Sequence, residues 1–252
     1  MMVVTDSLML AFDVGGSFVK AGLVHPTSGE IVGEVLRWPT PVSAAPEDVI
    51  AMLASMADEL PSDGPVGFAF PAVTKKGVAW TAANIDKRWI GTNARAQLQA
   101  RIQRPVAFLN DADAAGIAEM SLGAGRGRDG TVMVLTLGTG IGSAIFIDGR
   151  LLPNTELGHL EVRGQEAEHR ASARVRMDRN LDWHDWTEAV NLVLESYHAL
   201  FWPDLFIIGG GVTENWDEFG ELLHSRAEIL PAHFGNDAGI IGAAMAAAAL
   251  SK

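Results

Sequence analysis

Short apolar segments bounded by glycine or proline recur along the first part of the chain. Residues 8–14 and 18–24 predict two strands joined by a hairpin with two glycines in its turn, and residues 30–38 predict a third, antiparallel strand. Residues 64–70 and 106–109 are continuous apolar runs of the kind that form buried strands. The first part of the chain is therefore expected to contain a sheet with buried strands.

Helical periodicity alternates with these strands. Residues 46–60 begin with proline and two acidic residues and carry one apolar face, which predicts a helix. Residues 92–102 and 113–122 predict two more helices. Residues 74–89 have no clear period and predict a long functional loop or a short hairpin. The alternation of strands and helices indicates the α/β class.

The second part of the chain opens as the first part does. Residues 131–137 predict a strand that leads into a glycine-rich turn and a second strand ending at residue 147. The glycine-rich segment 123–130 precedes them and is a candidate hinge or linker between two halves. Two similar halves are therefore expected.

The remaining segments predict four helical regions and one strand. Residues 165–177 predict a charged, exposed helix, and residues 186–201 predict a longer helix with an apolar face. Residues 204–208 predict a strand that leads into three glycines and a helical region at about 214–224. Residues 239–250 are mostly small and predict a helix that packs closely against another element.

The composition excludes several classes of protein. With 252 residues, 48% of them hydrophobic, the chain can bury a substantial core. The net charge of −12, from 19 Lys+Arg and 31 Asp+Glu, argues against binding to nucleic acids or anionic membranes. Zero cysteines exclude disulfides and thiol nucleophiles and are compatible with a reducing compartment. The first residues lack the basic region of a signal peptide and no apolar run is long enough to span a membrane, so we expect a soluble cytoplasmic protein.

Asn110 and Asp111 lie between a predicted strand and a predicted helix. In open α/β sheets, ligands bind outside the carboxyl ends of the strands. A carboxylate at such a place, next to a side-chain amide, can hold a hydroxyl group and take its proton. The alternative is that Asp111 only caps the helix and Asn110 is a turn residue.

Two glycine-rich hairpins are candidates for phosphate binding. Glycines in the first turn can adopt positive φ and direct backbone N–H groups at a phosphate, while a carboxylate at the strand end could hold hydrated Mg²⁺; an ordinary tight hairpin is the alternative. The glycine string of the second hairpin precedes a β-branched strand rather than a helix, which excludes the dinucleotide-binding fingerprint. The candidate residues are Asp13, Gly15, Gly16, Ser17 and Lys20 in the first hairpin and Gly138, Thr139 and Gly140 in the second.

Glu156 and His159 flank a leucine and a glycine and could bind several hydroxyls of a polyol, as a sugar site requires. Zinc is a weaker interpretation, since no HExxH motif occurs and His159, His169 and His184 are irregularly spaced.

A triple glycine, Gly209, Gly210 and Gly211, follows a strand and lets backbone approach a flat ligand such as an adenine ring, or forms only a close-packed turn.

Taken in order, the segments DVGGSFVK, LNDADAAG, TLGTGIGSA, ELGH and IIGGG resemble the ROK family of sugar kinases. The resemblance implies an actin-like (ribonuclease H-like) α/β fold with two domains around a central cleft. Residues 1–111 and about 238–252 would form a smaller N-terminal domain, and residues from about 112 to 237 a larger C-terminal domain. Within the family, TAANIDKRWIGTNAR, LNDADAAG and NTELGHLEV resemble the polyphosphate glucokinases, including those that also use ATP and phosphorylate mannose.

The resemblance also implies a role for each candidate residue. Asp111 would be the general base, the two hairpins would bind phosphates, and the triple glycine would lie near the nucleotide. Most family members carry a cysteine cluster that binds structural zinc; this chain has no cysteine, so Mg²⁺ is expected and zinc is not. The sugar would be bound by Asn84, Asn110, Asp111, Glu156, His159 and a further glutamate, for which we favour Glu168 over Glu166.

The expected function is that of a polyphosphate- and ATP-dependent glucokinase, in which Asp111 accepts the proton of the 6-hydroxyl of glucose or mannose. A homodimer is expected because it is common in the family. One rival is an ATP-only kinase of another hexose or a hexosamine. A second rival is a non-catalytic sugar sensor on the same fold.

A basic stretch suggests how a long polyanion would reach the site. Residues 74–104 contain seven basic residues and one acidic residue, although the whole chain is acidic. Such a concentration of cations can guide polyphosphate electrostatically. We expect Lys75, Lys76 and Arg88 to do so, the alternative being an ordinary solvated surface.

Overall fold

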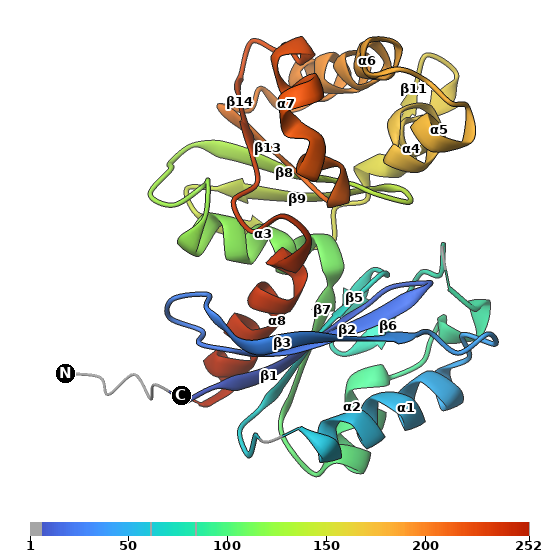
Figure 1. Cartoon of the computed structure of the whole chain (residues 1–252), viewed down its shortest axis with the longest axis vertical. Coiled ribbons are helices and arrows are strands. Elements are labelled where there is room, and N and C mark those ends of the chain that lie inside the picture. Colours follow the sequence, from blue (N-terminus) through green and yellow to red (C-terminus); the bar gives the residue numbers. More distant parts are fainter. Residues whose placement is uncertain (1–6, 61, 84, 252) are drawn as a thin grey trace. The chain divides into compact units, whose positions relative to one another are not determined.

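The structure is a computed structural model that describes residues 7–60, 62–83 and 85–251 (Figure 1). The chain divides into two compact units. Unit 1 comprises the residues up to Ala118 and those from Asp237 onward, and unit 2 comprises residues 119–236. The first division falls inside helix α3 (Asp111–Leu122), and unit 1 is the longer unit, whereas the sequence led us to expect a smaller N-terminal domain. The expected boundaries near 111 and 237 stay a prediction.

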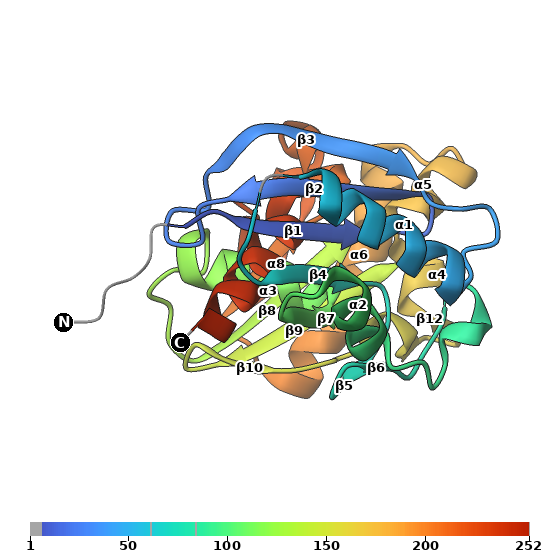
Figure 2. The same ribbon diagram turned by 90° about the horizontal axis from the view of Figure 1, so that it is seen from below.

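Unit 1 is built on a five-stranded sheet with the order β3-β2-β1-β4-β7 (Figure 2). Strands β1 and β2 form an antiparallel hairpin, and β3 is antiparallel to β2. Strands β4 and β7 continue the sheet parallel to β1. All five strands lie within two residues of the predicted positions: β1 (Met9–Val14), β2 (Phe18–Val24), β3 (Ile31–Pro39), β4 (Val66–Phe70) and β7 (Val106–Asn110).

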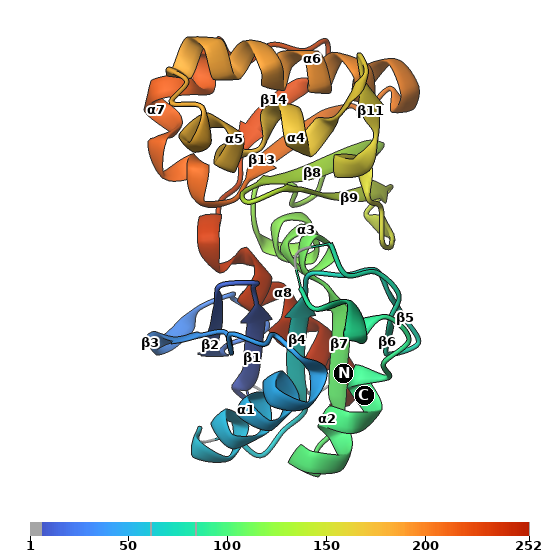
Figure 3. The same ribbon diagram turned by 90° about the vertical axis from the view of Figure 1, so that its right-hand side faces the viewer.

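The two faces of this sheet carry different side chains, because neighbouring residues of a strand point to opposite faces. Phe12 and Phe68 stack on one face with ring centroids 4.9 Å apart. Gly67, next to Phe68, lies on the other face, which helix α8 (Ala238–Ala248) covers (Figure 3). A Cβ on Gly67 would collide with the carbonyl oxygen of Ala243. The small-residue helix predicted from the sequence therefore does pack closely, within unit 1.

The aromatic face of the sheet packs against α1 (Pro46–Glu59) and α2 (Ala94–Ile102). Helix α1 has proline in its first turn and buries one face, as its periodicity predicts. Asn93 begins α2, since its side chain accepts a hydrogen bond from the N–H of Ala96 at 3.0 Å. The segment between β4 and α2 forms a short hairpin, β5 (Thr74–Lys75) and β6 (Val78–Ala79), followed by the 3₁₀ turn η1 (Lys87–Trp89).

Unit 2 repeats the strand order of unit 1. Its sheet has the order β10-β9-β8-β13-β14, in which β8, β9 and β10 are successively antiparallel and β13 and β14 are parallel to β8. Each sheet thus starts from a hairpin and adds two later strands in parallel, so the two similar halves expected from the sequence share one topology. The strands are β8 (Thr131–Leu137), β9 (Ile141–Ile147), β10 (Arg150–Leu152), β13 (Leu205–Gly209) and β14 (Glu228–Pro231); β10 and β14 were not predicted.

Helix α6 (Trp183–Phe201) covers one face of this sheet and buries Trp186 and Leu194 against Phe206. The prediction of a single exposed helix at 165–177 is wrong. Two short helices, α4 (Ala167–Ala171) and α5 (Ala173–Asp178), replace it because the extended Ser172 ends one and caps the next, accepting from the N–H of Val175 at 3.4 Å. The alanines at both ends of α4 are buried.

The rest of unit 2 consists of short elements. The helical region expected at 214–224 is broken into three turns, and the glycine-rich segment 123–130 lies within unit 2, so it is not a linker between the units. Among the described residues, no helix combines the length and the apolar character needed to cross a bilayer. The short elements of the chain are η2 (Leu157–His159), β11 (Glu161–Val162), β12 (Gln165–Glu166), η3 (Gly211–Asn215), α7 (Trp216–Phe219), η4 (Gly220–Leu222), η5 (Gly235–Asp237) and η6 (Ala249–Ser251).

Candidate functional site

The candidate base Asp111 is the first residue of α3 and directly follows the end of β7. The residue that caps this helix is Asn110, which is buried and accepts a hydrogen bond from the N–H of Asp113 at 3.0 Å. The amide of Asn110 also donates to the carbonyl of Ala72 at 3.2 Å. The alternative in which Asp111 is the cap and Asn110 a turn residue is therefore wrong: the amide fixes the helix start, and the half-buried carboxylate of Asp111 lies at the carboxyl end of a parallel strand.

In the β1–β2 hairpin, the candidate phosphate-binding residues pair with one another. Asp13 lies opposite Lys20 in the register, and their charged groups are 3.1 Å apart. Gly15 and Gly16 have φ outside the left-handed region, so positive φ is not the reason for these glycines. Gly15 is required instead by a close approach, because a Cβ there would lie 2.8 Å from the carbonyl oxygen of Phe18. The turn exposes Gly16 and Ser17.

Asp13 also lies against the start of α8. A Cβ on Gly239 would come within 3.1–3.3 Å of three atoms of the Asp13 carboxyl group, so glycine leaves room for it. The Asp13 side chain is 20% exposed. A single, partly exposed carboxylate fits Mg²⁺, which binds proteins through one or two carboxylates and keeps several waters.

In unit 2, the second glycine-rich hairpin and the triple glycine are neighbours. Gly210 has φ of 90°, and a Cβ there would lie 2.5 Å from the carbonyl oxygen of Leu137, the last residue of β8. Gly138 follows at once, and its carbonyl accepts from the N–H of Arg174 at 3.1 Å. Thr139, at the tip of the turn, is exposed. The structure thus brings together the two segments of unit 2 that the sequence assigns to phosphate and nucleotide.

The turn η2, which carries Gly158 and His159, is held in place from two sides. Gly158 lies so close to β9 that a Cβ would collide with the carbonyl oxygen of Ile141. The hydroxyl of Tyr197, on α6, donates to the carbonyl of Leu157 at 2.6 Å. Burial, and to a smaller degree Glu168, raise the pKa of Tyr197, which keeps this hydroxyl a donor. Tyr197 is thus a support of the site that we did not predict; the signal was a single tyrosine in the apolar face of a helix, since buried tyrosine hydroxyls usually find a partner.

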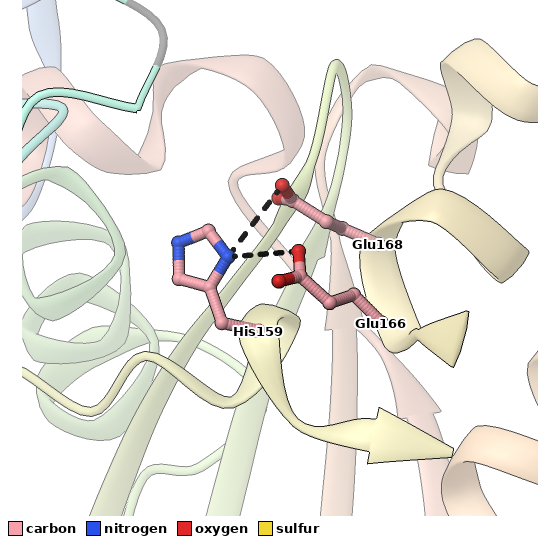
Figure 4. A group of neighbouring side chains, drawn as sticks. All are labelled: His159, Glu166 and Glu168. Atoms are coloured by element: carbon pink, nitrogen blue, oxygen red, sulfur yellow. Dashed lines mark hydrogen bonds and ion pairs between the residues drawn. The ribbon is translucent and has the colours of Figure 1, made fainter. Parts of the chain in front are cut away.

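Three glutamates surround the imidazole of His159, and Figure 4 shows two of them, Glu166 and Glu168. Nδ1 lies 3.3 Å from an oxygen of Glu166 and 3.7 Å from one of Glu168, and Nε2 lies 3.8 Å from one of Glu156. Burial raises the pKa of Glu156, opposed by His159 and assisted by Glu168. The Glu168 side chain is 15% exposed and that of Glu166 is 42% exposed. The structure therefore brings both candidate glutamates to the His159 ring.

The same cluster is the place where a metal could bind. Ligand atoms of His159, Glu166 and Glu168 lie within 4.8 Å of one another, and His169 approaches the same two glutamates at 3.6 and 3.8 Å. His184, the third histidine weighed for zinc, instead approaches Asp185 at 3.8 Å. The absence of zinc stays a prediction.

The remaining candidates lie on unit 1. Asn84 lies outside the described residues. Lys75 and Lys76 are exposed on the β5–β6 hairpin. Arg88 is held by two carboxylates, those of Asp86 and Glu47, each at 2.9 Å. This pairing neutralises Arg88 and leaves the two lysines as the stronger candidates to guide a polyanion.

Comparison with known proteins gives consistent matches. The sequence profile of the ROK family matches residues 9–173. The polyphosphate glucokinase of Mycobacterium tuberculosis (strain CDC 1551 / Oshkosh) is 46% identical over 94% of this chain and 90% of its own length. The crystal structure of the inorganic polyphosphate/ATP-glucomannokinase from Arthrobacter sp. strain KM has a TM-score of 0.93 and 44% identity, covering 98% of this chain and all of that chain.

A more distant structure has the same fold. A ROK family glucokinase from Streptomyces griseus, solved in complex with glucose and AMPPNP, has a TM-score of 0.82 at 24% identity and covers 95% of this chain. The α/β fold class of the sugar kinases predicted from the sequence is thereby confirmed.

Proposed function

Because the chain belongs to the ROK family, we propose that it transfers a phosphoryl group from inorganic polyphosphate or ATP to the 6-hydroxyl of glucose. The observation that carries the proposal is the half-buried carboxylate of Asp111 at the carboxyl end of β7, with Asn110 locked beside it. The names of the two most similar proteins described above support the same donor and acceptor.

Asp111 acts as the general base. Its carboxylate takes the proton of the 6-hydroxyl as that oxygen attacks the terminal phosphorus, and the bond from phosphorus to the donor's bridging oxygen breaks. The start of α3 favours negative charge at this position. Asn110 keeps the strand end and the helix start in a fixed geometry, since both ends of its amide are bonded to backbone.

The residues around η2 bind sugar hydroxyls. Glu156 and Glu168 accept hydrogen bonds from hydroxyls, and His159 offers a ring nitrogen. The fixed position of η2 against Tyr197 and β9 preorganises these groups, so that little ordering remains for the binding step. Asn84 is assigned to the sugar by resemblance alone.

The glycine hairpins bind the phosphates of the donor. In unit 1 these residues are Gly15, Gly16, Ser17 and Lys20, and in unit 2 they are Gly138, Thr139 and Gly140, with the triple glycine beside the nucleotide when ATP is the donor. Asp13 would hold Mg²⁺. The metal, when bound, neutralises negative charge on the phosphates.

The two rival functions make different predictions. An ATP-only kinase would not turn over with polyphosphate, and a sugar sensor would bind glucose without turnover. Initial rates measured side by side with ATP and with long-chain polyphosphate, over a panel of glucose, mannose and N-acetylated hexosamines, separate the three. Glucose 6-phosphate formation with polyphosphate supports the proposal, and its absence with both donors rejects it.

We also propose mannose as a second acceptor, a homodimer and a cytoplasmic location; the panel tests the first and sedimentation the second.

A further inference from the structure

The two nitrogens of the His159 ring are in different surroundings. Nδ1 is 3.3 Å from the Glu166 carboxylate, which is within hydrogen-bond distance. The oxygens of Glu168 and Glu156 lie farther away, at 3.7 Å from Nδ1 and 3.8 Å from Nε2. An ionised carboxylate only accepts hydrogen bonds, so a bond between Glu166 and Nδ1 requires the proton to be on Nδ1.

We infer that Glu166 is a positioning residue that holds His159 in the Nδ1–H tautomer. In the neutral ring, Nε2 is then an acceptor, and it lies on the side of Glu156. A hydroxyl that donates to Nε2 would be fixed in direction, which a freely rotating and tautomerising imidazole would not achieve. This inference rests on the proposed function, because it names the role of a residue in the same sugar site.

The backbone around Glu166 fixes its carboxylate. Glu166 belongs to β12, which pairs with β11 across a two-residue turn formed by Arg163 and Gly164, both with positive φ. Such a turn matches the twist of a hairpin and sets its register. Glu166 also approaches Nδ1 of His169 at 3.6 Å. The groups that face His159 are therefore Glu156, Glu166 and Glu168, and only Glu166 meets it at hydrogen-bond distance among the described residues.

Glu166 and Glu168 have different roles in this proposal. Glu168 is the less exposed of the two, and one of its oxygens would lie 3.5 Å from a Cβ on Gly158, so it lies at η2 together with Glu156. Glu168 therefore remains the sugar ligand, as expected from the sequence. Glu166 acts on the sugar only through His159.

The first experiment measures the tautomer directly, in the protein without sugar or donor. Histidine is labelled with ¹⁵N, and long-range ¹H–¹⁵N spectra of neutral His159 are recorded for the wild type, Glu166→Ala, Glu166→Gln and Glu161→Ala. The exposed Glu161 is the cross-strand partner of Glu166 and gives a matched loss of charge in the same hairpin. We expect Nδ1–H in the wild type, in Glu161→Ala and in Glu166→Gln, whose amide oxygen still accepts, and Nε2–H or a mixture in Glu166→Ala.

The second experiment measures glucose binding and kinetics for the same four proteins. Loss of the acceptor in Glu166→Ala should raise KM for glucose roughly tenfold, with a smaller change in kcat, because Nε2 of His159 is no longer held as the acceptor of the sugar hydroxyl. The KM of Glu166→Gln for glucose should stay within about threefold of the wild-type value, and the KM of Glu161→Ala should equal the wild-type value.

Three results would overturn the inference. One is an Nε2–H tautomer in the wild type. Another is a Glu166→Gln protein that behaves like Glu166→Ala, since charge rather than a hydrogen bond would then be responsible. The third is a stoichiometric divalent metal in the purified wild type that is lost in Glu166→Ala, because a metal on Nδ1 excludes a proton there. Failure of the proposed function is separate: a wild type that phosphorylates no sugar would leave the tautomer spectra and the glucose-binding series unaffected.

Discussion

The carboxylate of Glu119 accepts a hydrogen bond of 2.8 Å from the backbone N–H of Phe234, 115 residues further along the chain. It also accepts from the N–H groups of His233 and Ala124, both at 3.0 Å, and the side chain is fully buried. One carboxylate therefore ties the end of α3 to two segments of unit 2 that lie far apart in the sequence.

Glu119→Ala should destabilise the protein by about 2–3 kcal/mol, because it leaves three partly buried backbone donors without their acceptor. Glu119→Gln keeps one carbonyl oxygen as an acceptor, so its loss of stability should be smaller. Urea unfolding followed by circular dichroism measures both, and the exposed Glu221→Ala should stay within about 0.5 kcal/mol of wild type. Equal stabilities of the Glu119 and Glu221 variants would mean that backbone groups find other partners.

Asp111→Asn should still bind glucose but lose about 10²–10⁴-fold in kcat, because an amide cannot take the proton of the 6-hydroxyl. Calorimetry with glucose and a coupled assay with either donor measure the two properties. Asp58→Asn, at an exposed position of α1, is the control for the loss of one charge in unit 1. Turnover within a few-fold of wild type would remove Asp111 from the role of base.

Neutralising Lys75 and Lys76 together should raise KM for long-chain polyphosphate roughly three- to tenfold and leave KM for ATP nearly unchanged, since exposed charges contribute modestly and additively to attraction of a polyanion. The dependence of the polyphosphate KM on salt should also flatten. Adding Arg88→Gln should raise the KM for polyphosphate little further, because Arg88 already pairs with Asp86 and Glu47. Equal effects on both donors would reject guidance by the hairpin.

Glu156→Gln should change stability in a pH-dependent way. Burial raises the pKa of Glu156 in the folded protein above its ordinary 4.5, so the folded state favours the protonated form, and stability from this group is lost as pH rises through the raised pKa. Glutamine removes that loss. The variant should therefore match wild type at pH 4.5 or below and become the more stable protein toward pH 7, while losing affinity for glucose. Thermal unfolding across this range checks the sign, and a variant that is less stable at neutral pH would contradict it.

Tyr197→Phe should cost about 1 kcal/mol of stability and raise KM for glucose several-fold, because the hydrogen bond that holds Leu157 and hence η2 is lost. Ser196→Ala, which removes a hydroxyl bonded to Leu192 of the same helix, gives a matched loss that does not involve η2. If both variants left KM for glucose unchanged, Tyr197 would support the fold but not the sugar site.

Elements with strong local signals could be predicted from the sequence. The strand at 18–24 and the helix from Pro46 follow from period and first-turn residues, which are encoded within each segment. Strand β14 could not be predicted, because it is four residues long and lies at a sheet edge beside β13. The break at Ser172 was missed although serine favours helix starts, since the charge pattern on both sides suggested one continuous helix.

The sequence predicted which residues belong to the candidate site but not how their side chains contact one another. Glu156, His159 and Glu168 were chosen from spacing and resemblance, but nothing in the spacing says that Glu166 meets Nδ1 of His159. That contact depends on the turn at Arg163 and Gly164, which folds the chain back on itself. Contacts of this kind depend on backbone geometry that only the folded hairpin determines.

Helix α8 completes unit 1 with residues that the ribosome makes after the whole of unit 2. Strands β1, β2, β3, β4 and β7 leave the ribosome first, but the face that contains Gly67 is covered only when residues 238–248 arrive. Unit 2 is one uninterrupted segment, so its core can close during synthesis. The unit that is begun first is therefore completed last.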